Sequence, residues 1–146
     1  MKNWWKIVSV VLLLFTIIWG FLCPVPKLAI LHETIRNLFF HVTMWFGMMI
    51  ILTVSLYHSI LYLGKSNIKN DIIAAEATNV SILLGTLGLA TGSLWARYTW
   101  GAWWTNDPQL NGAAVTMLAY LAYVLLRNSI DDEQKRARIS AVYNIF

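Results

Sequence analysis

The stretch WGAWWTNDPQL, residues 100–110, lies between two long apolar runs and contains three tryptophans but almost no bulky aliphatic residues. Large aromatic faces gathered in one loop favour the binding of a flat ligand. An aromatic belt at a membrane interface is the alternative, because tryptophan is enriched there. Belt residues are usually spread over several helix ends. Here four of the eight tryptophans fall within ten positions, which favours a ligand.

His41 is the second residue whose side chain suggests chemistry. It lies about one turn inside the apolar run that begins at Leu38, with Trp45 one turn further on the same face. An ionisable side chain at that depth is a functional hypothesis by default, and a hydrogen bond to a neighbouring helix explains it equally well. His58 lies about 25 Å further along the helix and about 260° around it. The two histidines therefore cannot ligate one metal ion, nor do they share the face that a two-haem cytochrome b requires.

The composition excludes an ordinary soluble protein. Of the 146 residues, 58% are hydrophobic and only 12% are charged, whereas soluble domains have roughly 25% charged residues. Cys23 is the only cysteine, which excludes an internal disulfide and a metal site built from several thiolates. We therefore expect an integral membrane protein in contact with the lipid bilayer.

Apolar runs predict the fold, since a spanning helix needs about 20 mostly uncharged residues. We expect an all-α fold, a polytopic transmembrane helical bundle with four spanning helices plus the start of a fifth. The four runs are residues 7–23, 38–64, 72–94 and 112–126, the last being short unless it is counted from Pro108. The fifth opens at Ile139. Residues 1–146 are expected to form a single transmembrane domain, the N-terminal part of a longer protein.

The distribution of Lys and Arg predicts the orientation, because these residues are enriched in cytoplasmic loops. Of the 11, eight fall on the side of the N-terminus and three on the other. The eight are Lys2, Lys6, Lys65, Lys69, Arg127, Lys135, Arg136 and Arg138, and the three are Lys27, Arg36 and Arg97. We expect a cytoplasmic N-terminus and an outward-facing tryptophan stretch. The net charge of +4 reflects this topology, and the sequence has no aromatic-basic patch typical of nucleic-acid binding.

Six small residues form a stripe along the third run, separated by alternating steps of four and three: Ala74, Thr78, Ser81, Gly85, Gly88 and Gly92. This spacing places all six on one helix face. Small side chains let two backbones approach closely, so that van der Waals contact holds helices together in lipid. We expect this helix to pack at the centre of the bundle.

The segment after the third run is expected to be a loop that includes Trp95, Arg97 and Tyr98. It should end at Asp107, because an aspartate followed by Pro108 has the pattern of a helix start. The carboxylate then caps free N–H groups, and proline occupies the first helical position.

Two segments resemble the haem-handling proteins of cytochrome c biogenesis, the group that includes CcmC and CcsA. Their tryptophan-rich signature W-G-x-x-W-x-W-D is matched by Trp100, Gly101, Trp104 and Asp107. Asn106 stands where the signature has its later tryptophan, and Gln109 stands where many members have a basic residue. The segment IRNLFFHVTMW, residues 35–45, resembles the part of CcmC-like members that carries an axial histidine of haem, which maps that role onto His41.

The resemblance implies a site for haem b, a flat apolar ring with two carboxylates and an iron that takes axial nitrogen ligands. His41 is the implied metal ligand. The implied contacts to the ring and its carboxylates are Trp100, Gly101, Trp103, Trp104, Asp107, Arg36 and Arg97. A second axial histidine is missing, and His32 is a conceivable stand-in.

The function implied by the resemblance is haem binding and export at the outer face of the cytoplasmic (inner) membrane for cytochrome c maturation. The expected partners are a haem chaperone or apocytochrome c as the extracytoplasmic acceptor, and other cytochrome c biogenesis membrane subunits. The resemblance leaves open whether the protein is a haem handler or a component of a cytochrome c synthetase. The alternatives are a transporter or channel subunit with Glu76 and Asn79 as polar pathway residues, and a structural subunit with an aromatic belt.

Overall fold

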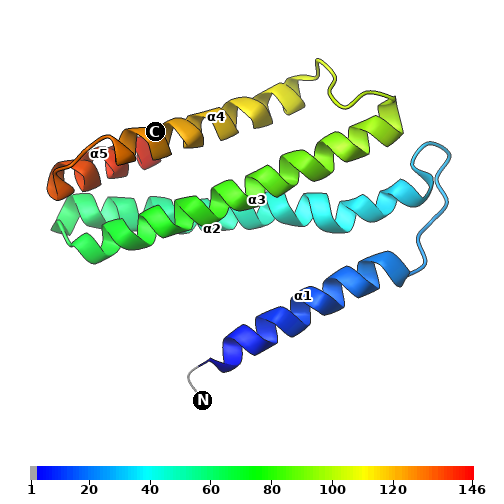
Figure 1. Ribbon diagram of the computed structural model, residues 1–146, viewed down its shortest axis with the longest axis horizontal. Helices are drawn as coiled ribbons and strands as arrows, with labels where there is room; N and C mark the ends of the chain where they lie inside the picture. Colours follow the sequence, from blue (N-terminus) through cyan, green and yellow to red (C-terminus); the bar gives the residue numbers. More distant parts are fainter. Residues whose placement is uncertain (1–2) are drawn as a thin grey trace.

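The computed structural model describes residues 3–146, and all regular elements in that range are helical (Figure 1). The elements are α1 (Trp4–Leu22), the 3-10 helix η1 (His32–Arg36), α2 (Asn37–Lys65), α3 (Ile68–Trp100), α4 (Pro108–Asn128) and α5 (Glu133–Ile145). Four helical segments, containing α1, α2, α3 and α4, are long and apolar enough to cross a membrane. The predicted all-α bundle with four spanning helices is confirmed.

Successive helices run in opposite directions, so their connections gather at two ends of the bundle (Figure 1). We call the end with connections 23–36 and 101–107 the aromatic end, and the end with turns 66–67 and 129–132 the polar end. Lys27, Arg36 and Arg97 lie at the aromatic end, as the grouping of basic residues predicted. Lys2, counted on the other side, lies outside the described residues.

The pair α2 and α3 forms the centre of the bundle, and the small-residue stripe of α3 is the reason. Thr78 and Ser81 are fully buried. A Cβ added at Gly85 would collide with the sulfur atoms of Met48 on α2 and Met117 on α4, so the two neighbouring helices converge on this glycine. The predicted central position of α3 is confirmed, since this helix contacts α2, α4 and α5.

Two helix boundaries differ from the prediction by six residues. Helix α3 continues to Trp100, so that Trp95, Arg97 and Tyr98 belong to the helix and not to the loop. Nothing in this segment breaks a helix until Gly101, whose φ of +80° is the left-handed conformation that ends helices at glycine. Helix α5 begins six residues before Ile139, because the side chain of Asp132 caps it by accepting from the backbone N–H of Lys135.

Helix α1 lies apart from the other helices and is exposed over nearly its whole length (Figure 1). Its contacts are concentrated near its C-terminal end, where the ring centroids of Phe21 and Phe40 are 5.2 Å apart. The guanidinium of Arg36 donates to the carbonyl oxygens of Gly20 and Cys23. A cation placed there stabilises the negative end of the α1 dipole, so Arg36 ties α1 to the start of α2.

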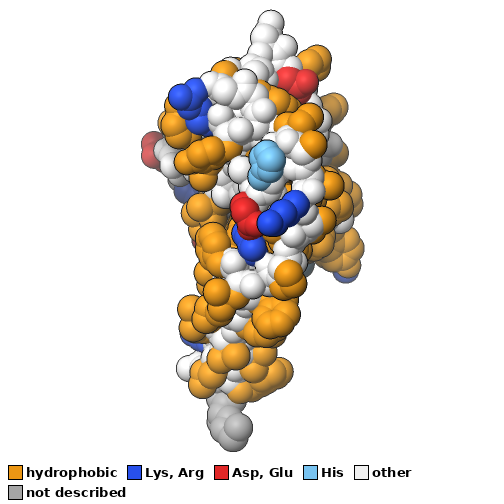
Figure 2. Space-filling view, turned by 90° about the vertical axis from the view of Figure 1, so that its right-hand side faces the viewer, with side chains coloured by type: hydrophobic (Ala, Val, Ile, Leu, Met, Phe, Trp, Pro, Cys, Tyr) orange, Lys and Arg blue, Asp and Glu red, His pale blue; other side chains and the backbone are white. Residues whose placement is uncertain are grey.

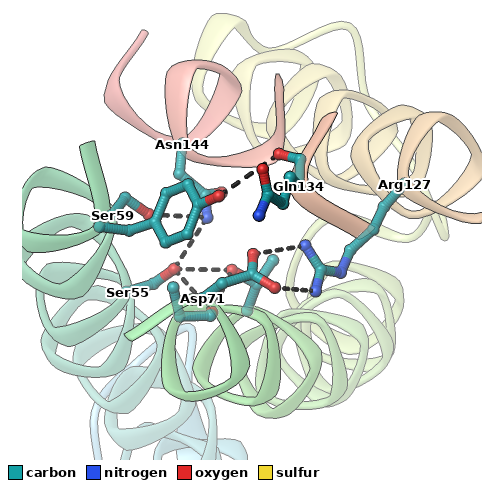
Figure 3. A network of polar contacts seen from close by, with 9 residues as sticks. Ser55, Ser59, Asp71, Arg127, Gln134 and Asn144 are labelled. Atoms are coloured by element: carbon teal, nitrogen blue, oxygen red, sulfur yellow. Dashed lines mark hydrogen bonds and ion pairs between the residues drawn. The ribbon is translucent and has the colours of Figure 1, made fainter. Parts of the chain in front are cut away.

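The polar end is closed by a buried hydrogen-bond network that joins α2, α3, α4 and α5 (Figure 3). Both Arg127 nitrogens Nη1 and Nη2 donate to the Asp71 carboxylate at 2.7 Å. The amide of Asn144 on α5 donates to Ser55 Oγ at 3.1 Å and to Ser59 Oγ at 3.3 Å. The network therefore holds α5 against α2 and holds α4 against α3.

Candidate functional site

A cavity of about 760 Å³ opens at the aromatic end between α2, α3 and α4. Its volume lies within the range of roughly 300 to 1,000 Å³ that small-molecule sites occupy. Aromatic and aliphatic side chains form most of its wall, and the polar lining residues include His41, Thr99, Asp107 and Gln109. An apolar hollow with few polar groups is the usual form of a site for a flat organic ligand.

His41 lines the cavity and is held by α3. Its Nδ1 lies 2.9 Å from the carbonyl oxygen of Gly88 and 3.2 Å from the hydroxyl oxygen of Thr91. A carbonyl oxygen only accepts, so Nδ1 carries the proton and donates to it. In the neutral imidazole Nε2 then has a free lone pair. The predicted hydrogen bond from His41 to a neighbouring helix is confirmed. This bond leaves Nε2 free and is therefore compatible with ligation of a metal through Nε2.

Two tryptophans flank the imidazole of His41 edge to face. The ring centroid of Trp45 is 6.3 Å from that of His41, and the ring centroid of Trp95 is 5.9 Å from it. Trp95 is itself fixed, because its Nε1 donates to Thr34 Oγ1 of η1 at 3.3 Å. The predicted common face of His41 and Trp45 is confirmed. The 3-10 helix η1 contributes to the cavity wall indirectly, because its Thr34 accepts from Trp95.

The glycines of the α3 stripe make room for these rings. A Cβ added at Gly88 would lie 2.9 Å from Cε2 of Trp45, and one added at Gly92 would lie 2.7 Å from Cε1 of His41. Real Cβ atoms do not approach other atoms so closely. Glycine at these two positions is therefore a condition for placing His41 and Trp45 against α3.

The α3–α4 connection is anchored to the first turns of α4. The side chain of Asp107 accepts from the backbone N–H groups of Gln109 at 2.8 Å and Leu110 at 3.2 Å. The indole N–H of Trp104 donates to Asn111 Oδ1 at 3.3 Å. The helix start predicted at Asp107 is confirmed, and Asn111 holds the side chain of Trp104 to the first turns of α4.

The predicted site residues separate into two groups. Those that line the cavity are His41, Trp100 and Asp107. Those that lie at the same end without lining it are Arg36, Gly101, Trp103, Trp104 and Arg97. Arg36 pairs with Glu33 through Nε at 2.8 Å, and Arg97 donates to the carbonyl of Gly101. Figure 2 views this end of the molecule and shows basic and acidic side chains among hydrophobic ones.

Sequence reasoning missed part of the cavity wall. Trp95 was assigned to the loop, although it lies on α3 beside His41. Gly88 and Gly92 were recognised as packing residues and not as the surface against which His41 and Trp45 lie. The available signal was their position in the stripe, four residues apart near the aromatic end of α3.

The whole chain, residues 1–146, matches the family described as heme exporter protein C (CcmC). The chain belongs to this family. The heme exporter protein C of Paracoccus denitrificans is 27% identical over 126 residues, which cover 86% of this chain and 52% of that protein. That of Rhodobacter capsulatus is 27% identical over 139 residues, 94% of this chain and 57% of that protein. The predicted resemblance is thus confirmed at the level of the family.

Similarity extends to the cytochrome c biogenesis protein CcsA of Prochlorococcus marinus, which is 36% identical over 76 residues, 52% of this chain and 24% of that protein. This chain spans about half the length of the two heme exporter proteins that it matches. Membership in this family, together with the apolar helices, identifies a multi-pass membrane protein.

Proposed function

We propose that the cavity at the aromatic end binds haem b as cargo, with Nε2 of His41 as one axial ligand of the iron. The observation that carries the proposal is the hydrogen bond from Nδ1 to the Gly88 carbonyl at 2.9 Å, in a cavity wall that contains His41. Histidines that bind metals usually donate their other ring N–H to a carbonyl or carboxylate, which orients the ring and raises its basicity. His41 already has this arrangement.

The remaining cavity wall fits a flat apolar ring. Trp45, Trp95 and Trp100 line the cavity, and aromatic faces favour contact with a porphyrin. The hydroxyl oxygen of Thr99 is buried without a hydrogen-bond partner in the described part of the chain. It is available to a polar edge of the cargo. Asp107 contributes by holding the first turn of α4, which forms the wall opposite α2.

The other predicted residues keep supporting parts in this proposal. Arg36 and Arg97 supply positive charge at the aromatic end, which attracts the two carboxylates of haem although neither side chain lines the cavity. Trp103 is 59% exposed and Trp104 is 41% exposed. Gly101 sets the direction of the loop that carries them. These two tryptophans therefore cover the outer edge of the cargo in the proposed complex.

The biological role that we propose is presentation of haem at the outer face of the cytoplasmic membrane during cytochrome c maturation. Family membership supports this role, because the relatives are named for heme export and cytochrome c biogenesis. The grouping of basic residues at the end away from the cavity supports a cytoplasmic N-terminus. The acceptor is then an extracytoplasmic haem chaperone or apocytochrome c, and other biogenesis subunits of the membrane are the partners.

The experiment is an absorption spectrum of the detergent-purified protein after addition of haem. The parent should show a Soret band of ligated haem. His41→Gly should lower haem retention and shift the band, and added imidazole should partly restore it by filling the vacated position. His58→Gly is the matched control on the same helix and should behave as the parent. An unchanged spectrum in His41→Gly would remove His41 from the site.

The transport alternative predicted from Glu76 and Asn79 gives a different result. These residues line a smaller cavity of about 250 Å³, which also contains Tyr123 and Arg127 and lies toward the polar end. A transport pathway through this smaller cavity predicts a protein that binds no haem and is therefore colourless. It also predicts transport defects in Glu76→Gln. The haem proposal predicts that Glu76→Gln binds haem normally, so the same spectrum separates the two functions.

A further inference from the structure

Three residues of α3 surround the imidazole of His41. The Gly88 carbonyl oxygen is 2.9 Å from Nδ1, and the Thr91 hydroxyl oxygen is 3.2 Å from it. Gly92 faces the ring edge, where an added Cβ would lie 2.7 Å from Cε1 and 3.2 Å from Nδ1. Residues 88, 91 and 92 lie on one side of α3, because steps of three and four residues follow the helical repeat.

The contacts determine which nitrogen of His41 carries the proton. The Thr91 hydroxyl donates within its own helix, to the Leu87 carbonyl at 2.8 Å. Its lone pairs are then free to accept from His41. The Gly88 carbonyl can only accept, and the Thr91 hydroxyl accepts here, so a neutral imidazole avoids repulsion from both oxygens when Nδ1 is protonated. The structure shows no hydrogen bond to Nε2 within residues 3–146.

The backbone around this site is tied down. The amide of Asn37, at the start of α2, donates to the carbonyl oxygen of Thr91 at 2.9 Å. This bond links the helix that carries His41 to the turn of α3 that receives Nδ1. The distance between the two helices is therefore constrained within one turn of the imidazole, and Gly92 permits that distance.

We propose that Thr91 and Gly92, together with the Gly88 carbonyl, are positioning residues that hold His41 as the Nδ1–H tautomer with Nε2 free for the iron. The proposal rests on the proposed haem function and adds the chain's own control of ligand geometry to it. Thr91 acts as the second acceptor for Nδ1–H. Gly92 acts by having no side chain, since a methyl group there displaces the ring from the Gly88 carbonyl.

The first test needs no haem. Long-range ¹H–¹⁵N spectra of protein labelled with ¹⁵N-histidine distinguish the two neutral tautomers at alkaline pH. His41 is assigned among the three histidines by the signal lost in His41→Gly. The parent should show Nδ1–H at His41, the reverse of the tautomer that free histidine prefers in water. Gly92→Ala should lose this preference, and Gly112→Ala should retain it, because a Cβ at Gly112 meets nothing within 4 Å.

The second test is haem titration of the same proteins. Gly92→Ala should weaken haem affinity about 10- to 100-fold, as does the loss of other groups that orient metal ligands. Thr91→Val should weaken it less than tenfold, because the Gly88 carbonyl remains, and should also raise the haem reduction potential because the imidazole donates less electron density. Thr91→Ser should restore both properties. Thr86→Val is the matched control, since Thr86 bonds only Ile82 on the exposed side of α3 within the described chain.

The outcomes separate the two proposals. Nε2–H at His41 in the parent, or equal haem affinity of Gly92→Ala and Gly112→Ala, would overturn the positioning role even if the parent binds haem. Failure of the parent to bind haem would overturn the haem function, while the tautomer spectra still decide whether α3 orients His41. If Gly92→Ala does not fold, the parent tautomer and the Thr91 series decide the question.

Discussion

The two ends of the bundle differ in what lies between α2 and α4. At the polar end α5 packs against α2, α3 and α4, and hydrogen bonds of Asp71 and Asn144 join these helices. At the aromatic end a cavity of about 760 Å³ lies between the same helices, and Nε2 of His41 has no partner in the described residues. The hydrogen-bonded polar groups hold four helices together at the polar end, whereas a nitrogen with a free lone pair in a cavity wall is available for binding.

The comparison also separates two kinds of ion pair. Asp71 and Arg127 pair through two 2.7 Å contacts, with side chains only 5% and 16% exposed. Glu33, the partner of Arg36 at the aromatic end, is 63% exposed. Removing one member of a buried pair leaves a charge without compensation, whereas an exposed pair contributes little. The stability of the bundle should therefore depend on the polar end.

The largest expected effect concerns the sides of the membrane on which the two ends lie. A reporter that is active only outside the cytoplasm should be active when fused after Asn106 and silent when fused after Asp132. These positions lie in the connections at opposite ends of α4. The reverse pattern of reporter activity would place the cavity on the cytoplasmic side and overturn haem presentation at the outer face.

Breaking the buried ion pair should give the largest loss of stability. We expect Asp71→Asn to lower the free energy of unfolding by about 3 kcal/mol, because Arg127 is left buried without its counter-charge. Glu33→Gln is the matched control and should cost about 1 kcal/mol or less. Thermal unfolding in detergent measures both. Equal losses would show that the two ends do not differ in the way that burial indicates.

Filling the stripe at the aromatic end should disturb the cavity. Gly88→Leu places a bulky side chain where Trp45 lies, so we expect a loss of about 3 kcal/mol in stability and loss of haem retention. Leu84→Ala, on the same helix but away from the imidazole, should retain haem and cost less, since Leu84 is only partly buried. Equal tolerance of the two changes in both assays would contradict the close packing of α3 on α2.

The smallest expected effects distinguish a tryptophan of the cavity wall from a tryptophan of the α3–α4 loop. Trp45→Ala is expected to weaken haem binding by about 1 to 3 kcal/mol, in line with truncation of a large aromatic at a binding site. Trp104→Ala should weaken it by less, because Trp104 does not line the cavity. Neither change should shift the haem spectrum much, because ring contacts do not touch the iron. A larger loss for Trp104 than for Trp45 would move the binding surface into the loop.

Local patterns predicted a large part of this architecture. The stripe from Ala74 to Gly92 predicted the central helix, and Asp107 with Pro108 predicted the start of α4, because packing faces and caps depend on residues close in sequence. The end of α3 was predicted too early. The predicted run ends at Leu94, which placed Trp95 and Arg97 in the loop, although neither of them breaks a helix.

The sequence by itself determined the membrane class, the four spanning helices, the family resemblance and His41 as a residue of interest, since composition, period and motif are local properties. Only the tertiary structure decided that Gly88 accepts from Nδ1 of His41, that Trp95 flanks the ring, and that Arg127 pairs with Asp71. Each of these contacts joins two different helices and residues that are 47 to 56 positions apart in the sequence. Such pairings depend on how α2, α3 and α4 pack, and no local pattern encodes the distance between two helices.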